Sequence, residues 1–285
     1  MSVAVWRCRE HVFPLGERTL VMGIVNVTPD SFSDGGLLSD AEEAVAYGVR
    51  LAAEGADILD IGGESTRPGS DPVPVDAELA RVVPVVAGLH EAAPDGVALS
   101  VDTRRPRVAR AAIEAGASIV NDVTAAADPA MFEVVRETGA ALVLMHMLGE
   151  PKTMQDDPRY DDVVTEVRDF LAARLGAAEA AGVPRDRLCV DPGIGFGKNL
   201  THNLTLLHDI ASFEDLRVPV VVGASRKRFI GQLTGVDDPA ERVEGTAGAV
   251  AWCAANGVDV VRVHDVLEMT RVVRVVDAIA RGVPS

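Results

Sequence analysis

Short apolar runs that alternate with helical segments are the feature that most constrains the fold of this chain. The first run covers residues 20–25, is rich in Val and Ile, and is too short to form a helix. Asn26 follows it, and a loop dense in Thr, Pro, Asp, Ser and Gly comes next. A continuous apolar run of this length is typical of a strand that is buried on both faces of a parallel sheet.

The same order of strand, polar loop and helix repeats to the end of the chain. Further strands are predicted at residues 57–62, 97–101, 118–120, 141–145, 188–190, 219–222 and 259–263. Helices are predicted at residues 39–54, 76–93, 161–181, 201–211, 239–256 and 266–281, with two more that begin at Pro106 and Pro129. Eight such units predict a closed α/β barrel, the (β/α)8 TIM barrel. A doubly wound open sheet is the alternative, but no glycine-rich dinucleotide fingerprint follows the first strand.

The length of the chain fits one barrel domain with a short N-terminal addition. The chain has 285 residues, and a single barrel has roughly 250. Residues 1–18 alternate weakly around Pro14 and Gly16, which predicts a β-hairpin that caps one end of the barrel. Residues 19–285 are predicted to be the catalytic domain, because no linker or low-complexity tract divides them.

Composition and charge exclude several classes of partner. Hydrophobic residues make up 48% of the chain, yet no apolar run is long enough to span a bilayer. The N-terminus has no signal-peptide core, so a soluble, cytoplasmic protein with no membrane partner is expected. The formal net charge of −16 argues against a nucleic-acid partner. Cys8, Cys189 and Cys253 are isolated in the sequence and are predicted to be reduced.

Polar side chains gather at the carboxyl ends of the predicted strands, where barrels of this kind build their sites. Asp102, Asn121 and Asp191 offer hydrogen-bond acceptors and one amide donor. A buried carboxylate can accept two parallel N–H bonds from the edge of a planar heterocycle. These residues therefore indicate a flat, nitrogen-rich ring as a ligand.

A second group of strand-end and loop residues is cationic or able to bind anions. It consists of Arg67, Lys227, Arg262 and His264. Arg presents a planar fork to phosphate oxygens, and the loops after strands seven and eight of a barrel commonly bind phosphate. The ring pocket and the anion pocket together predict a heterocycle that carries a phosphoryl or diphosphoryl leaving group. Asn26 can supply an oxygen to a Mg²⁺ ion that bridges such oxygens.

Six motifs resemble those of the dihydropteroate synthase family. They are NVTPDSFSDGG (residues 26–36), GGESTRPG (62–69), LMHMLGEPKTMQ (144–155), DPGIGFGKN (191–199), GASRKRFIG (223–231) and RVH (262–264). Members of this family are barrel enzymes of folate biosynthesis, usually homodimers, and are the target of sulfonamides. The resemblance implies a transferase that joins hydroxymethyl-dihydropterin diphosphate to 4-aminobenzoate and releases diphosphate.

The resemblance also implies roles for individual residues. The pterin is expected to bind Asp102, Asn121, Met145, Asp191, Gly223, Lys227 and Arg262. The diphosphate is expected to bind Asn26, Arg67, Arg262 and His264, with Asn26 also a ligand of the Mg²⁺ cofactor. The 4-aminobenzoate is expected to bind Phe32, Thr66, Pro68, Phe196, Lys227 and Arg228. The residues expected to take part in catalysis are Asp102, Asp191, Lys227, Arg262 and His264.

One position departs from the family pattern. Many bacterial members carry Ser directly after the lysine of strand seven, where it helps to hold the carboxylate of 4-aminobenzoate, whereas this chain has Arg228. Two interpretations of Arg228 stay open: its backbone N–H serves the carboxylate, or the residue is a solvated cation at a helix start. Two further residues near the motifs are given structural roles. His146 is expected to be a packed or rim histidine. The Gly-rich loop could bring Lys198 to the site, but a solvated lysine is the preferred interpretation.

Two other functions share part of this pattern. A corrinoid-linked methyltetrahydrofolate methyltransferase has a similar pterin-reading barrel, but it would not need the NVTPDSF motif or the anion group. A non-catalytic pterin-binding paralogue would keep the three strand-end acceptors and lose loop residues. The loop residues are present here, which favours the active enzyme: Phe32, Ser65, Thr66, Arg67 and Lys227.

Overall fold

The computed structural model of the chain describes residues 5–27, 37–65, 72–150 and 152–282, with the backbone alone at 37–40. Four residues expected in the site, Phe32, Thr66, Arg67 and Pro68, lie outside these ranges. Within them, no helix is long and apolar enough to cross a membrane.

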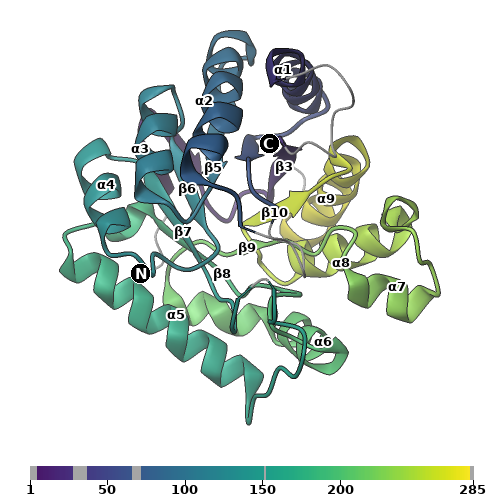
Figure 1. The fold of residues 1–285 in the computed structure, drawn as a ribbon. Helices are drawn as coiled ribbons and strands as arrows, with labels where there is room; N and C mark the ends of the chain where they lie inside the picture. The colour runs from purple at the N-terminus through teal and green to yellow at the C-terminus, as the bar shows by residue number, and fades with distance from the viewer. Residues whose placement is uncertain (1–4, 28–36, 66–71, 151, 283–285) are drawn as a thin grey trace.

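Eight parallel strands form a ring at the centre of the molecule (Figure 1). They are β3 (Leu20–Asn26), β4 (Ile58–Gly62), β5 (Ala98–Asp102), β6 (Ile119–Asp122), β7 (Ala141–Met145), β8 (Leu188–Asp191), β9 (Val221–Val222) and β10 (Val260–Val263). Hydrogen bonds join them in the order β8-β7-β6-β5-β4-β3-β10-β9. A parallel bridge between Val190 and Val220 links β8 to the segment before β9 and closes the ring. The predicted (β/α)8 barrel is confirmed.

Helices surround the ring on its outer side (Figure 1). Within the described ranges the α-helices are α1 (Leu37–Ala53), α2 (Val75–Ala92), α3 (Pro106–Glu114), α4 (Ala130–Thr138), α5 (Val163–Ala180), α6 (Leu200–His208), α7 (Arg228–Thr234), α8 (Val243–Ala255) and α9 (Val266–Arg281). Local chemistry fixes several ends. Pro106 occupies the first turn of α3, the Asp162 carboxylate caps α5, and Gly139 ends α4 in the left-handed conformation.

The predicted boundaries agree with the structure except in the last third of the chain. The helix predicted at 201–211 ends at His208 and continues as a 3₁₀ segment, Ile210–Leu216. The helix predicted at 239–256 is a 3₁₀ turn, Pro239–Glu241, followed by α8. Helix α7 was not predicted. The strand predicted at 219–222 is shorter because Pro219 has no N–H and the Val220 N–H bonds to the Asp259 carboxylate at 2.9 Å.

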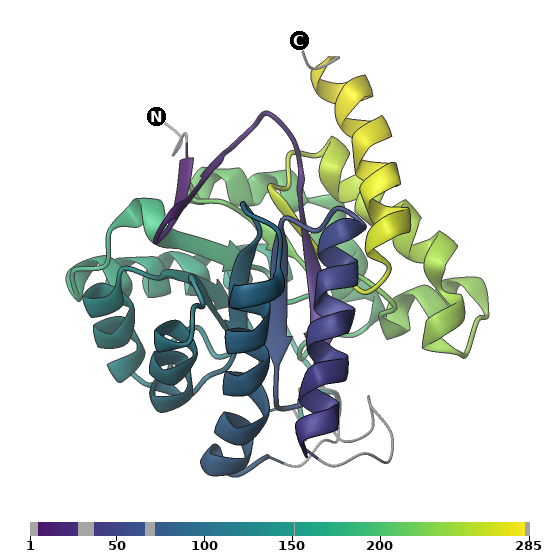
Figure 2. The ribbon, with the colours of Figure 1, turned by 90° about the horizontal axis from the view of Figure 1, so that it is seen from above.

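An N-terminal β-hairpin covers one end of the barrel, as predicted. Strands β1 (Val5–Cys8) and β2 (His11–Pro14) pair antiparallel. Trp6 and Phe13 are buried, and they pack in one cluster with the first inward residues of the barrel strands. Figure 2 shows the hairpin and the end of α9 at the same end of the molecule, while α1 starts at the opposite end. The carboxyl ends of the barrel strands therefore point away from the hairpin.

Alternation along the strands divides the core into two clusters. In β3, Leu20 and Met22 belong to the inner cluster beside the hairpin, whereas Val21 and Val25 belong to the larger cluster between the strands and the helices. Successive side chains of a strand point to opposite faces, so every second residue enters the barrel. This period decides which strand-end residues reach the site.

Candidate active site

The pleat of the strands brings the predicted acceptors to one layer inside the barrel. Ala98, Ile119 and Cys189 lie in the inner cluster. Each is separated by an even number of positions from a predicted acceptor on its own strand, so these acceptors also face inward: Asp102, Asn121 and Asp191. Asp102 pairs in register with Asn121 across β5 and β6, and both are nearly buried. A cleft opens above this layer. It is lined by Ile24, Asp102, Asn121, Val123, Met145, Asp191, Ile194, Phe196, Gly223, Ser225, Lys227, Arg262 and His264.

Most of the described residues that were expected in the site line this cleft. They are Asp102, Asn121, Met145, Asp191, Phe196, Gly223, Lys227, Arg262 and His264. Two expected residues do not line it. Asn26 ends β3 and is partly exposed, and the side chain of Arg228 is exposed at the start of α7. For Arg228, this exposure favours the interpretation as a solvated cation at a helix start.

An acidic residue that the sequence analysis did not select organises the floor of the cleft. Asp60 lies in the middle of β4 and is fully buried. Its Oδ2 accepts one hydrogen bond from Asn121 Nδ2 at 3.0 Å and another from Arg262 Nε at 2.6 Å. Arg262 Nη2 donates to Asp102 Oδ2 at 2.9 Å. Asp60 thus fixes both the amide and the guanidinium that face the ligand.

Burial shifts the proton affinity of both carboxylates that face the cleft. For Asp102, burial raises the pKa to about 7, with Arg262 opposing the rise and Asp60 adding to it. Burial also raises the pKa of Asp191, although its Oδ1 accepts the Gly193 N–H at 2.7 Å, which favours the ionised form. Burial thus disfavours the negative charge of each carboxylate unless a positive charge lies beside it, so both are suited to stabilise positive charge that develops on a ligand between them.

Lys227 faces the two carboxylates from the loop after β9. Its Nζ lies 4.0 Å from the centroid of the Phe196 ring, within the range of a cation–π interaction. Burial lowers the pKa of Lys227 to about 8, and the charge of Asp191 opposes that effect. The side chain is therefore a hydrogen-bond donor with an aromatic ring against its face, and both groups line the same wall of the cleft.

His264 is held at the edge of the cleft by a serine that the sequence analysis also missed. Ser225 Oγ lies 3.0 Å from His264 Nδ1 and accepts the His264 backbone N–H at 3.2 Å. If Ser225 donates to Nδ1, the Nε2 of the neutral ring carries the proton and can donate it to an anion. Ser225 could have been predicted from its position in the GASRKRFIG motif, two residues before Lys227.

His146 and Lys198 lie together next to the cleft, and only the position of Lys198 is unexpected. His146 is buried at the end of β7, as expected for a packed histidine. Lys198 was expected to be solvated, but only 2% of it is exposed, and its Nζ lies 2.9 Å from His146 Nδ1. The expectation was wrong because the loop after β8 folds back over the end of β7, a contact between segments that are far apart in the sequence.

The described residues include no group of three or more His, Cys, Asp or Glu that could hold a metal ion. Asn26 is the one protein oxygen donor expected for Mg²⁺, and it is partly exposed at the carboxyl end of β3. Mg²⁺ commonly keeps several waters and binds one or two protein oxygens together with phosphate oxygens of the substrate. An amide oxygen at the rim fits that mode of binding.

Comparison with known proteins agrees with this geometry. A family described as pterin binding enzyme matches residues 22–264. The dihydropteroate synthase of Escherichia coli (strain K12) is 46% identical over 258 residues, which cover 90% of each chain. The chain belongs to the dihydropteroate synthase family.

Solved structures of dihydropteroate synthases share the whole fold. The enzyme of Xanthomonas albilineans, determined with 4-aminobenzoic acid, is 48% identical and covers 100% of both chains with a TM-score of 0.91. The enzyme of Burkholderia cenocepacia, complexed with 7,8-dihydropteroate, is 44% identical and covers 98% of this chain and 97% of its own, with a TM-score of 0.86. For a dihydropteroate synthase, a cleft lined by buried carboxylates, an amide and cations is the expected place for a charged heterocycle.

Proposed function

We propose that this chain is a dihydropteroate synthase in activity as well as in family. It condenses hydroxymethyl-dihydropterin diphosphate with 4-aminobenzoate, and the products are dihydropteroate and diphosphate. The observation that carries the proposal is the inward layer of Asp102, Asn121 and Asp191, beside the cations of the same cleft. Related enzymes solved with 4-aminobenzoic acid and with 7,8-dihydropteroate support the choice of substrates.

The pterin ring is assigned to the floor of the cleft. Asp102, Asn121 and Asp191 present acceptors and an amide donor to the nitrogen-rich edge of the ring, and Met145 supplies an apolar wall. Hydrogen bonds to Asp60 and Asp102 fix the orientation of the Arg262 guanidinium, and such a planar group can stack on a planar ring. A buried acceptor that lacks a donor costs binding free energy, so a ring with fewer N–H groups should bind more weakly than the pterin.

The diphosphate is assigned to the rim above Arg262 and His264. The bond between the pterin methylene and the diphosphate oxygen breaks, and the electron pair leaves with the oxygen. Arg262 and His264 lie where they can stabilise the charge of the departing group. A Mg²⁺ ion held in part by Asn26 would neutralise further diphosphate charge. The ionised carboxylates of Asp102 and Asp191 stabilise the positive charge that develops on the pterin.

The 4-aminobenzoate is assigned to the wall formed by Phe196 and Lys227. The amine nitrogen attacks the methylene carbon with its lone pair, forms the new C–N bond and then loses one proton. Phe196 gives the ring an apolar surface, and the ammonium of Lys227 lies 4.0 Å from the centroid of that phenyl ring. The remaining expected residues of this pocket, Phe32, Thr66 and Pro68, lie outside the described residues.

The proposal also includes a cytoplasmic homodimer, as the family resemblance implies. Leu233 of α7 and Trp252 of α8 are exposed apolar side chains on two helices that contact one another, and burial of such side chains would favour a dimer. Equilibrium sedimentation of the full chain tests dimerisation, and a monomer at all concentrations would contradict it.

A coupled diphosphate-release assay with both substrates tests the activity. We expect release only when both substrates and Mg²⁺ are present, and loss of release in Asp191→Asn. That substitution keeps the shape of the side chain but replaces a charged acceptor with an amide, a change worth about 1.5–3 kcal/mol of binding. Asp157→Asn is the control, because Asp157 pairs with Arg159 on the surface. Normal pterin affinity in Asp191→Asn, measured by calorimetry, would remove Asp191 from the site.

A further inference from the structure

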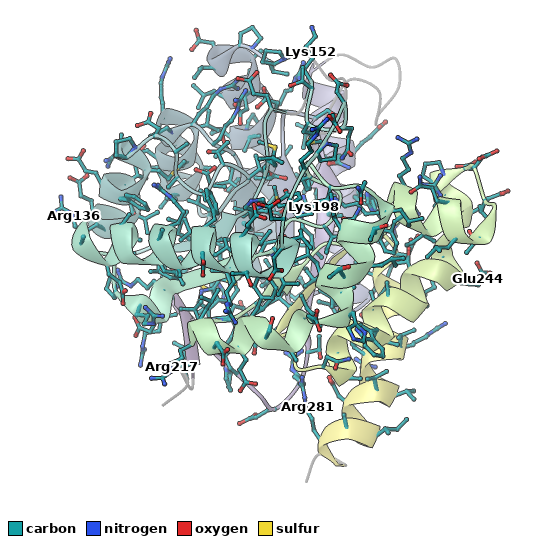
Figure 3. The ribbon with its side chains drawn as sticks, turned by 90° about the horizontal axis from the view of Figure 1, so that it is seen from below. Arg136, Lys152, Lys198, Arg217, Glu244 and Arg281 are labelled. Atoms are coloured by element: carbon teal, nitrogen blue, oxygen red, sulfur yellow. The ribbon has the colours of Figure 1, made fainter. Side chains whose placement is uncertain are left out.

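Lys198 is a buried lysine that none of the roles assigned above uses. Burial lowers its pKa to about 7, and the charge of Asp191 opposes that effect and favours the ammonium form. It ends the Gly-rich loop between β8 and α6, and only 2% of the residue is exposed. Figure 3 places it toward the middle of the molecule, whereas Arg136, Arg217 and Arg281 lie near its edge. The chain has three lysines, and two of them, Lys198 and Lys227, lie at this one site.

The side chain of Lys198 joins the end of β7 to the loop that carries Phe196. Its Nζ lies 2.9 Å from His146 Nδ1, at the end of β7, and donates to the Phe196 carbonyl oxygen at 3.0 Å. Burial, together with the charge of Lys198, lowers the pKa of His146 to about 3, so the imidazole is neutral. The Nδ1 lone pair can then accept a hydrogen bond from the ammonium. The His146 ring is itself fixed, because it packs edge-on against Phe170 with centroids 4.9 Å apart.

The same loop is held at the two carbonyls on either side of Phe196. Gln155 Nε2 donates to the Gly195 carbonyl oxygen at 2.5 Å, and the Tyr160 hydroxyl donates to that of Gly197 at 2.9 Å. With Lys198 on the Phe196 carbonyl, three consecutive carbonyls accept a side-chain hydrogen bond. Of the three donors, Lys198 is the one that donates to Phe196, and the ring of Phe196 contacts the Lys227 ammonium.

We propose that Lys198 is a positioning residue of this active site, which ties Phe196 to the end of β7 and thereby holds the Phe196 ring against the Lys227 ammonium. This role rests on the proposed function only where it concerns 4-aminobenzoate. The placement of Phe196 against Lys227 is a property of the protein itself.

The energetic cost of burying Lys198 supports a positioning role over simple filling of space. Removing an ammonium from water is expensive, and an apolar side chain of similar volume in such a place is often neutral or stabilising. Lys198 also adds positive charge near Asp191, which opposes the effect of burial on that carboxyl. A methionine would fill the same space and supply neither the donors nor the charge.

The first test needs no substrate and uses the small number of lysines. In protein labelled with ¹³C-lysine, the ε-methylene signals of Lys152, Lys198 and Lys227 can be followed separately. Lys227 lies over the Phe196 ring, so its ε-methylene protons should be shifted upfield by the ring current. Lys198→Met removes one signal, and we expect that of Lys227 to move toward the position of the exposed Lys152. An unchanged Lys227 signal in the folded variant would overturn the proposal.

The second test separates positioning from stability. We expect Lys198→Met to raise the KM for 4-aminobenzoate by about tenfold or more, as small displacements of a substrate-positioning group do. The KM for pterin diphosphate should change much less. Arg9→Met is the matched control, since Arg9 Nη1 also donates to two backbone carbonyls, those of Ile113 and Ala117, at the hairpin end of the barrel. It should lower stability without changing either KM.

Lys198→Gln covers the case in which the methionine variant does not fold. Gln keeps N–H donors and removes the charge, so it should retain more of the Lys227 shift and more of the 4-aminobenzoate affinity than Met. If both KM values change in parallel in either folded variant, Lys198 is only structural and the proposal is wrong. A parent chain without synthase activity would refute the proposed function, while the Lys227 signal would still decide the positioning role.

Discussion

At the scale of single residues, Asp60 shows how a buried residue outside the cleft can determine the geometry of the residues that line it. It does not line the cleft, yet it binds the side chains of Asn121 and Arg262, which do. A buried carboxylate near other acidic groups also changes their proton affinity. Asp60 therefore acts on both the orientation and the ionisation of the pterin-facing groups.

Asp60→Asn should move the acid limb of activity to lower pH. Burial raises the pKa of Asp102 to about 7, Arg262 opposes this effect, and the charge of Asp60 adds to it. Because Asp102 accepts ring N–H groups when ionised, kcat/KM for pterin diphosphate should rise as the pH rises through that pKa. Without the Asp60 charge, the pKa of Asp102 falls and the rise comes at lower pH.

The pH dependence of kcat/KM, measured in both proteins with the same substrate, checks this shift. Ionisation of the diphosphate affects parent and variant equally, so the difference between them reports the enzyme. Asp157→Asn serves again as the surface control, with its limb unmoved. An acid limb at the same pH in Asp60→Asn would show that Asp102 does not control binding.

Arg228→Ser tests the position at which the chain departs from its family. The Arg228 side chain is exposed and lies outside the cleft lining. We therefore expect the KM for 4-aminobenzoate to stay within about twofold of the parent value, as for most exposed side chains. A rise of about tenfold, equivalent to roughly 1.4 kcal/mol, would assign the side chain to the substrate.

At the scale of elements, the loop after β8 has the tightest steric requirements of the site. Gly193 has a φ of +69°, and a Cβ atom placed there would lie 1.9 Å from the His146 carbonyl oxygen. That contact can be relieved only by moving the loop or the end of β7. The loop carries Phe196 and Lys198, and His146 directly follows β7. The positions of these three residues therefore depend on the close approach of the two backbone segments.

Gly193→Ala should therefore destabilise the protein and reduce its activity together. Strain of this kind costs about 1–3 kcal/mol for the backbone conformation alone, and the clash adds to it. Urea unfolding measures the loss, with Gly176→Ala as the control. Gly176 lies in α5 with nothing within 4 Å of an added Cβ, so alanine there should stabilise the helix by up to about 1 kcal/mol. Equal stability of the two variants would contradict the close approach.

The sequence was sufficient for the order of elements but not for every boundary. Long apolar strands and helices with clear caps, such as α5 with Asp162, were predictable from local chemistry. Helix α7 was not, because its seven residues form only about two turns and begin within a motif that otherwise resembles a loop. The shortened β9 depends on the side chain of Asp259, which is near Val220 only in the folded barrel.

The site divides in the same way between sequence and structure. Asp102, Asn121 and Asp191 were predictable because they lie at or next to strand ends, and the alternation of side chains along a strand turns them inward. Asp60 had a signal that was passed over, since a charged residue inside an apolar strand, at even spacing from Ile58, must face the barrel interior. For Lys198 the Gly-rich loop indicated a possible contact with the site, but its burial was not predictable, because its partner His146 is 52 residues away in the sequence.

At the scale of the whole molecule, the barrel separates stability from activity. The hairpin cluster fills one end, and the cleft residues lie at the carboxyl ends of the strands. In barrels of this kind the amino-terminal face contributes stability, while the opposite face carries the chemistry. Substitutions in the hairpin should therefore change unfolding without changing substrate binding.

Trp6→Ala tests this separation directly. Trp6 is fully buried in the hairpin cluster, lies 6.1 Å from the Phe13 ring centroid, and donates from Nε1 to the Arg187 carbonyl oxygen. Truncating a buried Trp removes its apolar contacts and leaves a cavity, so we expect a loss of about 3–5 kcal/mol in the free energy of unfolding. Ile279→Ala, at a side chain that is 80% exposed, should change stability by less than about 0.5 kcal/mol.

Urea unfolding and steady-state kinetics on the same preparations give the two readouts. Under conditions where Trp6→Ala is fully folded, KM for both substrates should match the parent, because the barrel strands between the hairpin and the cleft are hydrogen-bonded to their neighbours. A rise in either KM would mean that loosening the hairpin end alters the Asp102 and Asn121 layer. The barrel interior would then transmit strain from one end to the other, and the two faces could not be treated as independent.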